Sequence, residues 1–135
     1  MGEKWRREDL TEKIISACIS VHKELGPGFL EGIYHNALKV EFTRSKLFFE
    51  SEKELKVYYR GVEVGIHKID LLVEHEVIVE LKTVEVLNKK YYAQVRSYLA
   101  ALNKEVGLLI NFSGYSVDIR SVELKRIGKE NGYSD

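Results

Sequence analysis

A chain of 135 residues and 15.6 kDa has the size of one domain with its own hydrophobic core. Lysine plus arginine and aspartate plus glutamate number 21 each, which excludes a strongly basic nucleic-acid-binding domain, so any contact with nucleic acid must come from a local patch. The one cysteine excludes an internal disulfide framework, and the lack of a run of ~20 apolar residues or of a signal-peptide start predicts a cytoplasmic protein without a membrane span.

Helical spacing of apolar residues predicts two helices in the first third of the chain, after a loosely held start at residues 1–8. Asp9 with Glu12 resembles a capping box, and apolar residues follow at helical spacing: Leu10, Ile14, Ala17, Cys18, Val21 and Leu25. Gly26-Pro27-Gly28 ends this helix. A second helix is predicted from Leu30 to Arg44, with an apolar face made of Leu30, Ile33, Tyr34, Ala37, Leu38 and Phe42.

The middle of the chain has the periodicity of β-strands. Residues 49–59 and 62–73 form a predicted hairpin that turns at Arg60-Gly61. Residues 77–83 form a third strand, and its apolar density indicates a central position in the sheet.

The last third predicts a helix between two further strands. The helix follows Asn88 and is marked by Tyr91 or Tyr92, Val95, Tyr98, Leu99 and Leu102. A buried strand at 106–112 comes next, and a short strand lies within 117–127. A right-handed parallel crossover should join the third strand to the fourth. The expected fold is α/β, a single mixed central sheet flanked by helices in the order α-α-β-β-β-α-β-(β), forming one domain at 9–127 with flexible termini at 1–8 and 128–135.

Charged residues interrupt the two most apolar strands. Asp70, Glu80 and Lys82 lie among apolar residues that are predicted to be buried, where a charge costs several kcal/mol unless it is paired or binds a metal. If residues 74–76 form a three-residue loop, Val73 faces Val77. Asp70 then lies opposite Glu80 and Lys68 opposite Lys82, with all four charged side chains on one face.

Two carboxylates on adjacent strands suit Mg²⁺, and the Leu81 carbonyl could add a further oxygen. Lys82 could orient or deprotonate a metal-bound water, or neutralise charge on a phosphate. An ion pair between strands explains the same residues about equally well.

Three other residues are candidates with simpler explanations. Glu31 begins the second helix within Gly28-x-x-Glu31-x-x-Tyr34, where the helix dipole alone favours a carboxylate. Gln94 and Tyr98 share one face of the third helix and could fix a carboxylate or a phosphate. By pattern alone, a solvated Gln94 and a core Tyr98 are the favoured explanation of that spacing.

Taken together, these segments resemble the GxxExxY proteins over roughly residues 10–127. The matching segments are Gly28-Phe29-Leu30-Glu31-Gly32-Ile33-Tyr34, Ile69–Val73, Val77–Lys82, Ala93–Leu99 and Gly107–Phe112. That family is placed in the PD-(D/E)xK nuclease-like superfamily, and the helix with Gln94 and Tyr98 is similar to the QxxxY helix of RecB-like nucleases. The chain departs from the pattern at Lys68, where an arginine is more usual, and at Ile69, where the superfamily motif has proline.

The resemblance implies a restriction-endonuclease-like core and a nuclease site. That site would consist of the first-motif acid Glu31, the metal-binding acids Asp70 and Glu80, the catalytic Lys82 and the supporting pair Gln94 and Tyr98. The expected activity is Mg²⁺-dependent hydrolysis of phosphodiester bonds in nucleic acid, DNA being the expected substrate and Mn²⁺ an alternative ion. The alternative is a binding module that keeps the nuclease fold and holds nucleic acid or protein without cutting. A homodimer through exposed Tyr58, Tyr91 and Tyr115 stays open.

Overall fold

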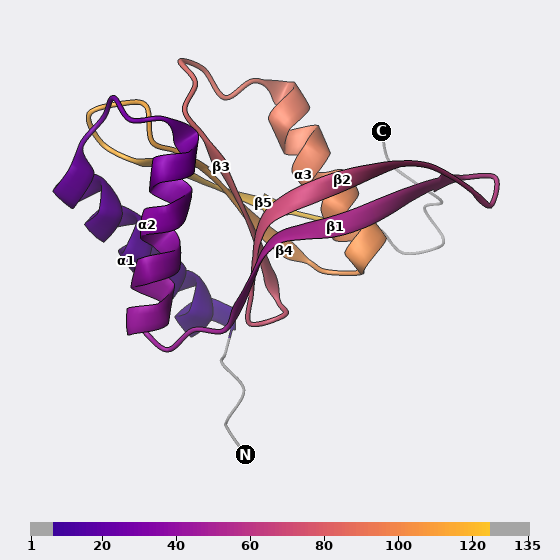
Figure 1. The fold of residues 1–135 in the computed structure, drawn as a ribbon, viewed down its shortest axis with the longest axis horizontal. Helices are drawn as coiled ribbons and strands as arrows, with labels where there is room; N and C mark the ends of the chain where they lie inside the picture. The colour runs from indigo at the N-terminus through magenta and orange to yellow at the C-terminus, as the bar shows by residue number, and fades with distance from the viewer. Residues whose placement is uncertain (1–6, 125–135) are drawn as a thin grey trace.

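The computed structural model describes residues 7–124 and shows a five-stranded mixed sheet between helices (Figure 1). The elements are α1 (Arg7–Leu25), α2 (Glu31–Arg44), β1 (Phe49–Tyr59), β2 (Val62–Val73), β3 (Val77–Lys82), α3 (Lys89–Leu102), β4 (Val106–Asn111) and β5 (Asp118–Glu123). The strand order is β1-β2-β3-β4-β5, with β3 at the centre as predicted. Of the strand pairs in this part of the chain, β3 and β4 alone are parallel, so α3 is the predicted crossover between them. No helix of residues 7–124 is long and apolar enough to cross a membrane.

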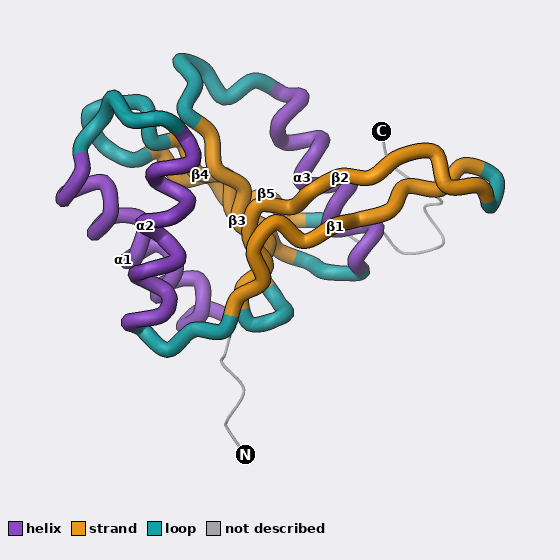
Figure 2. Tube along the Cα trace, viewed as in Figure 1, coloured by secondary structure: helices purple, strands orange, loops and turns teal. Residues whose placement is uncertain are grey.

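The core has two layers, one on each face of the sheet. Alternate residues of β3, namely Val77, Val79 and Leu81, pack with α1 and α2, whereas Ile78 packs with α3. Figure 2 shows α1 and α2 together on one side of the strands. The α3 layer is close: a Cβ placed on Gly107 of β4 would lie 2.7 Å from Val95 Cγ1. Glycine at this position therefore lets the crossover helix sit against the sheet.

The β1–β2 hairpin is longer than the sheet that it joins. Its turn at Arg60-Gly61 has positive φ at both residues (51° and 80°), as the favoured two-residue hairpin turns require. β2 pairs with β3 only from Leu71–Val79 to Val73–Val77, so the rest of the hairpin leaves the sheet as a two-stranded arm (Figures 1 and 2). Residues 62–68 of β2 are all exposed on this arm.

Several predicted details are corrected. α1 already includes Arg7 and Glu8, so Asp9 lies inside its first turn and is not the cap. Residues 1–6 and the predicted tail at 128–135 lie outside the described residues. β3 and β4 each end one residue before the prediction, at Lys82 and Asn111.

The apolar face predicted for α2 is also partly wrong. Leu30 is 78% exposed and Ile33 is 42% exposed, because α2 covers the sheet only along the stripe Tyr34, Leu38 and Phe42. Tyr58 and Tyr115 are exposed as expected, but Tyr91 is half-buried because it packs against the α3 layer.

Candidate active site

The candidate site lies where β2 separates from β3. Beyond the Leu71–Val79 pair the backbone ladder stops, and two carboxylates bond the backbone N–H groups there. Glu80 Oε1 accepts a hydrogen bond from the Asp70 N–H at 2.9 Å, and Asp70 Oδ2 accepts one from the Leu81 N–H at 2.8 Å. Val73 pairs with Val77 as predicted, but the predicted Lys68–Lys82 pair does not form, because the β2–β3 ladder ends at Leu71–Val79 and Lys68 pairs only with Glu54 of β1 among the described residues.

The hairpin also changes face at this point. Leu71 packs on the α1–α2 side of the sheet and Ile69 on the α3 side, although residues two apart in a regular strand share a face. On β1 the residue between the partners of these two is Glu52, whose φ is +54°. Asp70 therefore sits at a local twist, and the expected single face for all the charged residues is not observed.

Burial and mutual repulsion dominate the electrostatics of the acidic pair. Glu80 is 4% exposed. Desolvation, followed by the charge of Asp70, raises the pKa of Glu80 from 4.5 to about 8. Desolvation also raises the pKa of Asp70, against the opposing effects of the Leu81 N–H, His35 and Lys82. A buried Glu80 next to a half-buried Asp70 thus favours binding either a proton or a cation.

Glu31 comes to this place from the first turn of α2. Desolvation raises its pKa, the charge of Asp70 raises it further, and Lys82 lowers it, so the three side chains lie within electrostatic range. The position of α2 depends on Tyr34, whose hydroxyl donates to the Gly26 carbonyl at 2.5 Å. The Tyr34 ring stacks on Phe112, directly after β4, with centroids 4.5 Å apart. The tyrosine of the Gly28-x-x-Glu31-x-x-Tyr34 motif therefore anchors the helix that carries the acid.

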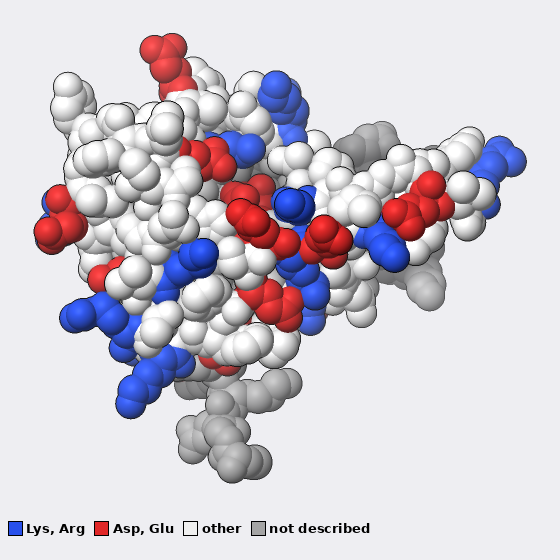
Figure 3. Space-filling view, in the orientation of Figure 1, with Lys and Arg blue, Asp and Glu red and all other residues white. Residues whose placement is uncertain are grey.

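Lys82 supplies positive charge beside all three acids. Its charge lowers the pKa of Glu31, Asp70 and Glu80. Figure 3 shows side chains of both signs gathered between α2 and the base of the hairpin. The Lys82 ammonium lies over the ring of Tyr91, 4.6 Å from its centroid.

The pair on α3 is only partly joined to this group. Tyr98 is buried and its hydroxyl lies 3.3 Å from His67 Nδ1 on the arm. Burial, Glu80 and Asp70 raise the pKa of Tyr98 to about 12, so its ring is near the acids. Gln94 is half-buried one turn earlier, and no hydrogen bond within residues 7–124 ties its amide to the carboxylates.

Sequence reasoning missed two histidines at this site. His35 lies one turn after Glu31 on α2, its Nε2 atom is 3.1 Å from Ser51 Oγ, and its charge lowers the pKa of Asp70. The four-residue spacing from Glu31 could have indicated it. No local pattern in the sequence pairs His67 with Tyr98, because the contact joins the arm to α3.

The donor set suits a hard divalent ion without forming a complete cage. No group of three or more His, Cys, Asp or Glu side chains within residues 7–124 is arranged to hold a metal. Mg²⁺, however, commonly binds through one or two carboxylates and keeps several waters. Burial, followed by the charge of Asp70, raises the pKa of Glu80, and a bound divalent ion would offset both effects. Asp70 and Glu80 therefore fit the ion, with Glu31 in electrostatic range.

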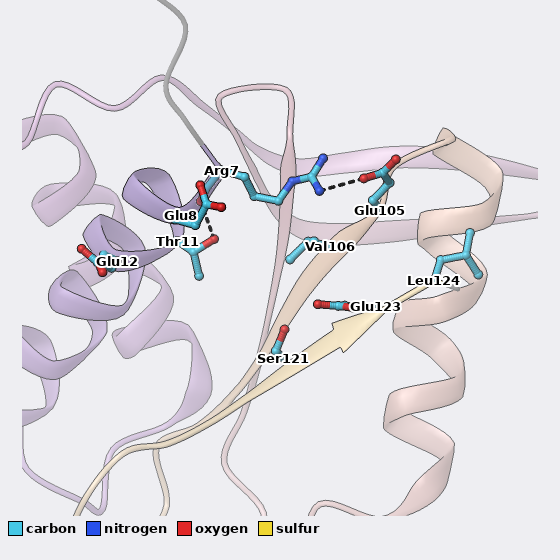
Figure 4. Close-up of a pocket in the computed structure, with 9 residues that line it drawn as sticks. All are labelled: Arg7, Glu8, Thr11, Glu12, Glu105, Val106, Ser121, Glu123 and Leu124. Atoms are coloured by element: carbon cyan, nitrogen blue, oxygen red, sulfur yellow. Dashed lines mark hydrogen bonds and ion pairs between the residues drawn. The ribbon is translucent and has the colours of Figure 1, made fainter. Parts of the chain in front are cut away.

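A pocket of about 680 Å³ lies away from this group (Figure 4). It is formed by the start of α1, the start of β4 and the end of β5, and is lined by Arg7, Glu8, Thr11, Glu12, Glu105, Val106, Ser121, Glu123 and Leu124. A half-exposed ion pair between Arg7 and Glu105, 2.7 Å long, spans it. None of the predicted site residues lines this pocket, so its size does not make it the active site.

Comparison with known proteins identifies relatives of this chain in fold and in sequence. A solved crystal structure of SSO0001 has a TM-score of 0.53 and 15% identity, covering 91% of this chain and 62% of that one. This similarity supports the restriction-endonuclease-like α/β fold, and the chain spans under two thirds of that protein's length. No curated protein sequence matches the chain. The family profile of the PD-(D/E)XK nuclease superfamily matches residues 8–127, and the chain therefore belongs to the PD-(D/E)XK nuclease superfamily.

Proposed function

We propose that this protein is a Mg²⁺-dependent nuclease that hydrolyses phosphodiester bonds of nucleic acid, with DNA as the substrate. The observation that carries the proposal is the pair Asp70 and Glu80, held by backbone N–H groups at the end of the β2–β3 ladder beside Lys82. Membership in a nuclease superfamily supports the reaction class. The catalytic unit is the domain at 9–127, of the GxxExxY type with a QxxxY helix.

The acids would hold the metal. Asp70 and Glu80, with Glu31 and the Leu81 carbonyl as further ligands, would bind Mg²⁺ or Mn²⁺. When bound, the ion would supply Lewis-acid stabilisation of the phosphate and a more acidic water. The Asp70–Leu81 and Glu80–Asp70 hydrogen bonds fix one oxygen of each carboxylate and leave the other oxygen for a ligand.

The remaining residues act on the substrate directly or hold the acids. Lys82 brings a positive charge next to the acids, where it can stabilise the charge that develops on a phosphate or orient the attacking water. Tyr98 and Gln94 lie one turn apart on α3, and the charges of Glu80 and Asp70 act on Tyr98. Tyr98 and Gln94 would steady the carboxylates or the scissile phosphate.

Cleavage of defined DNA tests this proposal. Purified protein is incubated with single-stranded and duplex DNA in Mg²⁺, Mn²⁺ or EDTA. We expect metal-dependent cleavage that falls at least ~100-fold in Asp70→Asn and in Lys82→Ala, since each removes a charge needed in the transition state. Lys68→Ala, a lysine on the exposed part of β2, is the matched control and should cut normally. Cleavage that is equal in all four proteins would contradict the proposal.

A binding module that retains the fold is the second candidate. It is favoured by the balanced charge of 21 basic and 21 acidic residues, and by the absence of a three-ligand metal group in the described part of the chain. DNA binding that survives EDTA, with no turnover over hours, would support this candidate instead.

A further inference from the structure

The ammonium of Lys82 rests on an aromatic ring rather than on a carboxylate. Its Nζ atom lies 4.6 Å from the centroid of Tyr91, within the range of a cation–π interaction. Lys82 forms no ion pair with an acid among residues 7–124. Among the described residues, the ring of Tyr91 is thus the partner that this ammonium contacts in place of an ion pair.

We propose that Tyr91 is a positioning residue for Lys82. The ring of Tyr91 holds the Lys82 ammonium beside Glu31, Asp70 and Glu80. The inference rests on the proposed function for the role of Lys82. A lysine side chain has a flexible four-carbon stem and about 2 kcal/mol of rotamer entropy. A fixed ring below the ammonium restricts those rotamers while leaving its N–H groups available to water or phosphate. An ion pair would occupy those same groups.

The ring itself is well fixed. Tyr91 lies in the first turn of α3, and its N–H donates to the Asn88 carbonyl at 3.1 Å. The Asn88 side chain caps the same turn by accepting from the Lys90 N–H at 3.0 Å. The Tyr91 side chain packs against the apolar layer beneath α3. One side of the ring is therefore held by the core, and Lys82 uses a site whose position is set by the crossover helix.

A second lysine reaches the same ring from outside. Lys90 Nζ lies 5.5 Å from the Tyr91 centroid, and Lys90 is exposed. Two ammonium groups at one ring repel each other, so Lys90 does not hold Lys82 on the ring of Tyr91. Removal of Lys90 should consequently leave the position of Lys82 unchanged, which makes Lys90→Ala a matched control.

The test compares Tyr91→Phe with Tyr91→Leu in the cleavage assay. Phenylalanine keeps the aromatic face and should keep kcat within about twofold, whereas leucine should lower kcat by roughly 3- to 30-fold with little change in KM. Tyr92→Leu removes a neighbouring half-buried ring and should retain activity, as should Lys90→Ala. Equal activity of the phenylalanine and leucine variants would overturn the proposal.

A readout that does not need activity separates this inference from the proposed function. Protons held over a ring face are shifted upfield in NMR spectra, so the Lys82 ε-methylene signal should be shifted in the wild-type protein and in Tyr91→Phe. It should return to an ordinary position in Tyr91→Leu. An unshifted signal in the wild-type protein would show that the Lys82 ammonium does not lie over the ring of Tyr91. A shifted signal together with full activity of Lys82→Ala would refute the nuclease role of Lys82, whereas the contact between Lys82 and the Tyr91 ring would stand.

Discussion

The two halves of β2 have opposite environments. Residues 69–73 lie between the two core layers and, apart from Asp70, are buried, whereas residues 62–68 are all exposed on the arm. In the buried half, pairs of apolar residues such as Leu71–Val79 continue the sheet. In the exposed half, β1 is the only strand that pairs with β2 within residues 7–124. The same strand is therefore core at one end and surface at the other.

The boundary between the halves explains where the acids are tolerated. A strand that leaves its neighbour exposes backbone N–H groups that need acceptors. Asp70 and Glu80 supply those acceptors at this boundary. At this opening of the sheet the two carboxylates satisfy backbone N–H groups, and each has a second oxygen that is available for chemistry.

The largest expected effect on stability comes from shortening a side chain in the buried half of β2. Leu71 is 0% exposed, and Leu71→Ala should lower the free energy of unfolding by about 2–5 kcal/mol because it leaves a cavity. Val64 on the arm is 60% exposed, and Val64→Ala should change it by no more than ~0.5 kcal/mol. Urea denaturation measures both. Similar losses in the two variants would show that the arm is packed in solution.

A smaller effect is expected at the boundary, from Glu80→Gln. The folded pKa of Glu80 is about 8, above its ordinary value of 4.5, so the folded state holds this proton more tightly. The resulting stabilisation is complete below about pH 4.5 and is lost as the pH rises through about 8. In EDTA, the glutamine variant should therefore be more stable than wild type at pH 8–9, by a few kcal/mol at most.

Thermal unfolding from pH 5 to pH 9 measures this difference. Glu54→Gln, an exposed acid on β1, is the control and should follow the wild-type curve. Mg²⁺ should raise the wild-type melting temperature at pH 8 more than that of Glu80→Gln. If the wild-type and Glu80→Gln curves run parallel, Glu80 does not titrate in this range.

The smallest effect concerns the link between α2 and the boundary. His35 Nε2 lies 3.1 Å from Ser51 Oγ, and Ser51 pairs with Leu71, next to Asp70. Each of His35→Ala and Ser51→Ala should cost about 1 kcal/mol, and the double variant should cost no more than either one, because both remove one hydrogen bond. Thr43→Ala on the same helix should instead add to His35→Ala. Additive losses for His35 and Ser51 would mean that the bond contributes nothing.

Much of the fold could be predicted because its signals are local. The hairpin turn at Arg60-Gly61 and the Val73–Val77 pairing follow from alternation and loop length, and the structure confirms both. Leu30 and Ile33 were expected in the core and are exposed, because a local pattern does not tell how wide a stripe of a helix will be covered.

The residues of the candidate site could be predicted from the sequence, but most of the contacts between them could not. The apolar context of Asp70 and Glu80 pointed to the acids, and their roles stay predictions. The structure also shows a twist at Glu52 that no residue pattern announces. Two contacts, His67 with Tyr98 and Lys82 with Tyr91, join elements that are separate in the sequence. No spacing rule along the chain predicts such contacts.

The single cysteine gives the molecule a built-in reporter of its own opening. Cys18 is 0% exposed in the α1–α2 layer, and burial raises its thiol pKa to about 12. A thiol of this kind reacts with alkylating reagents only when the layer around it opens, since the thiolate is the reactive form. The rate of labelling therefore reports how often the layer around Cys18 opens, without any substitution in the protein.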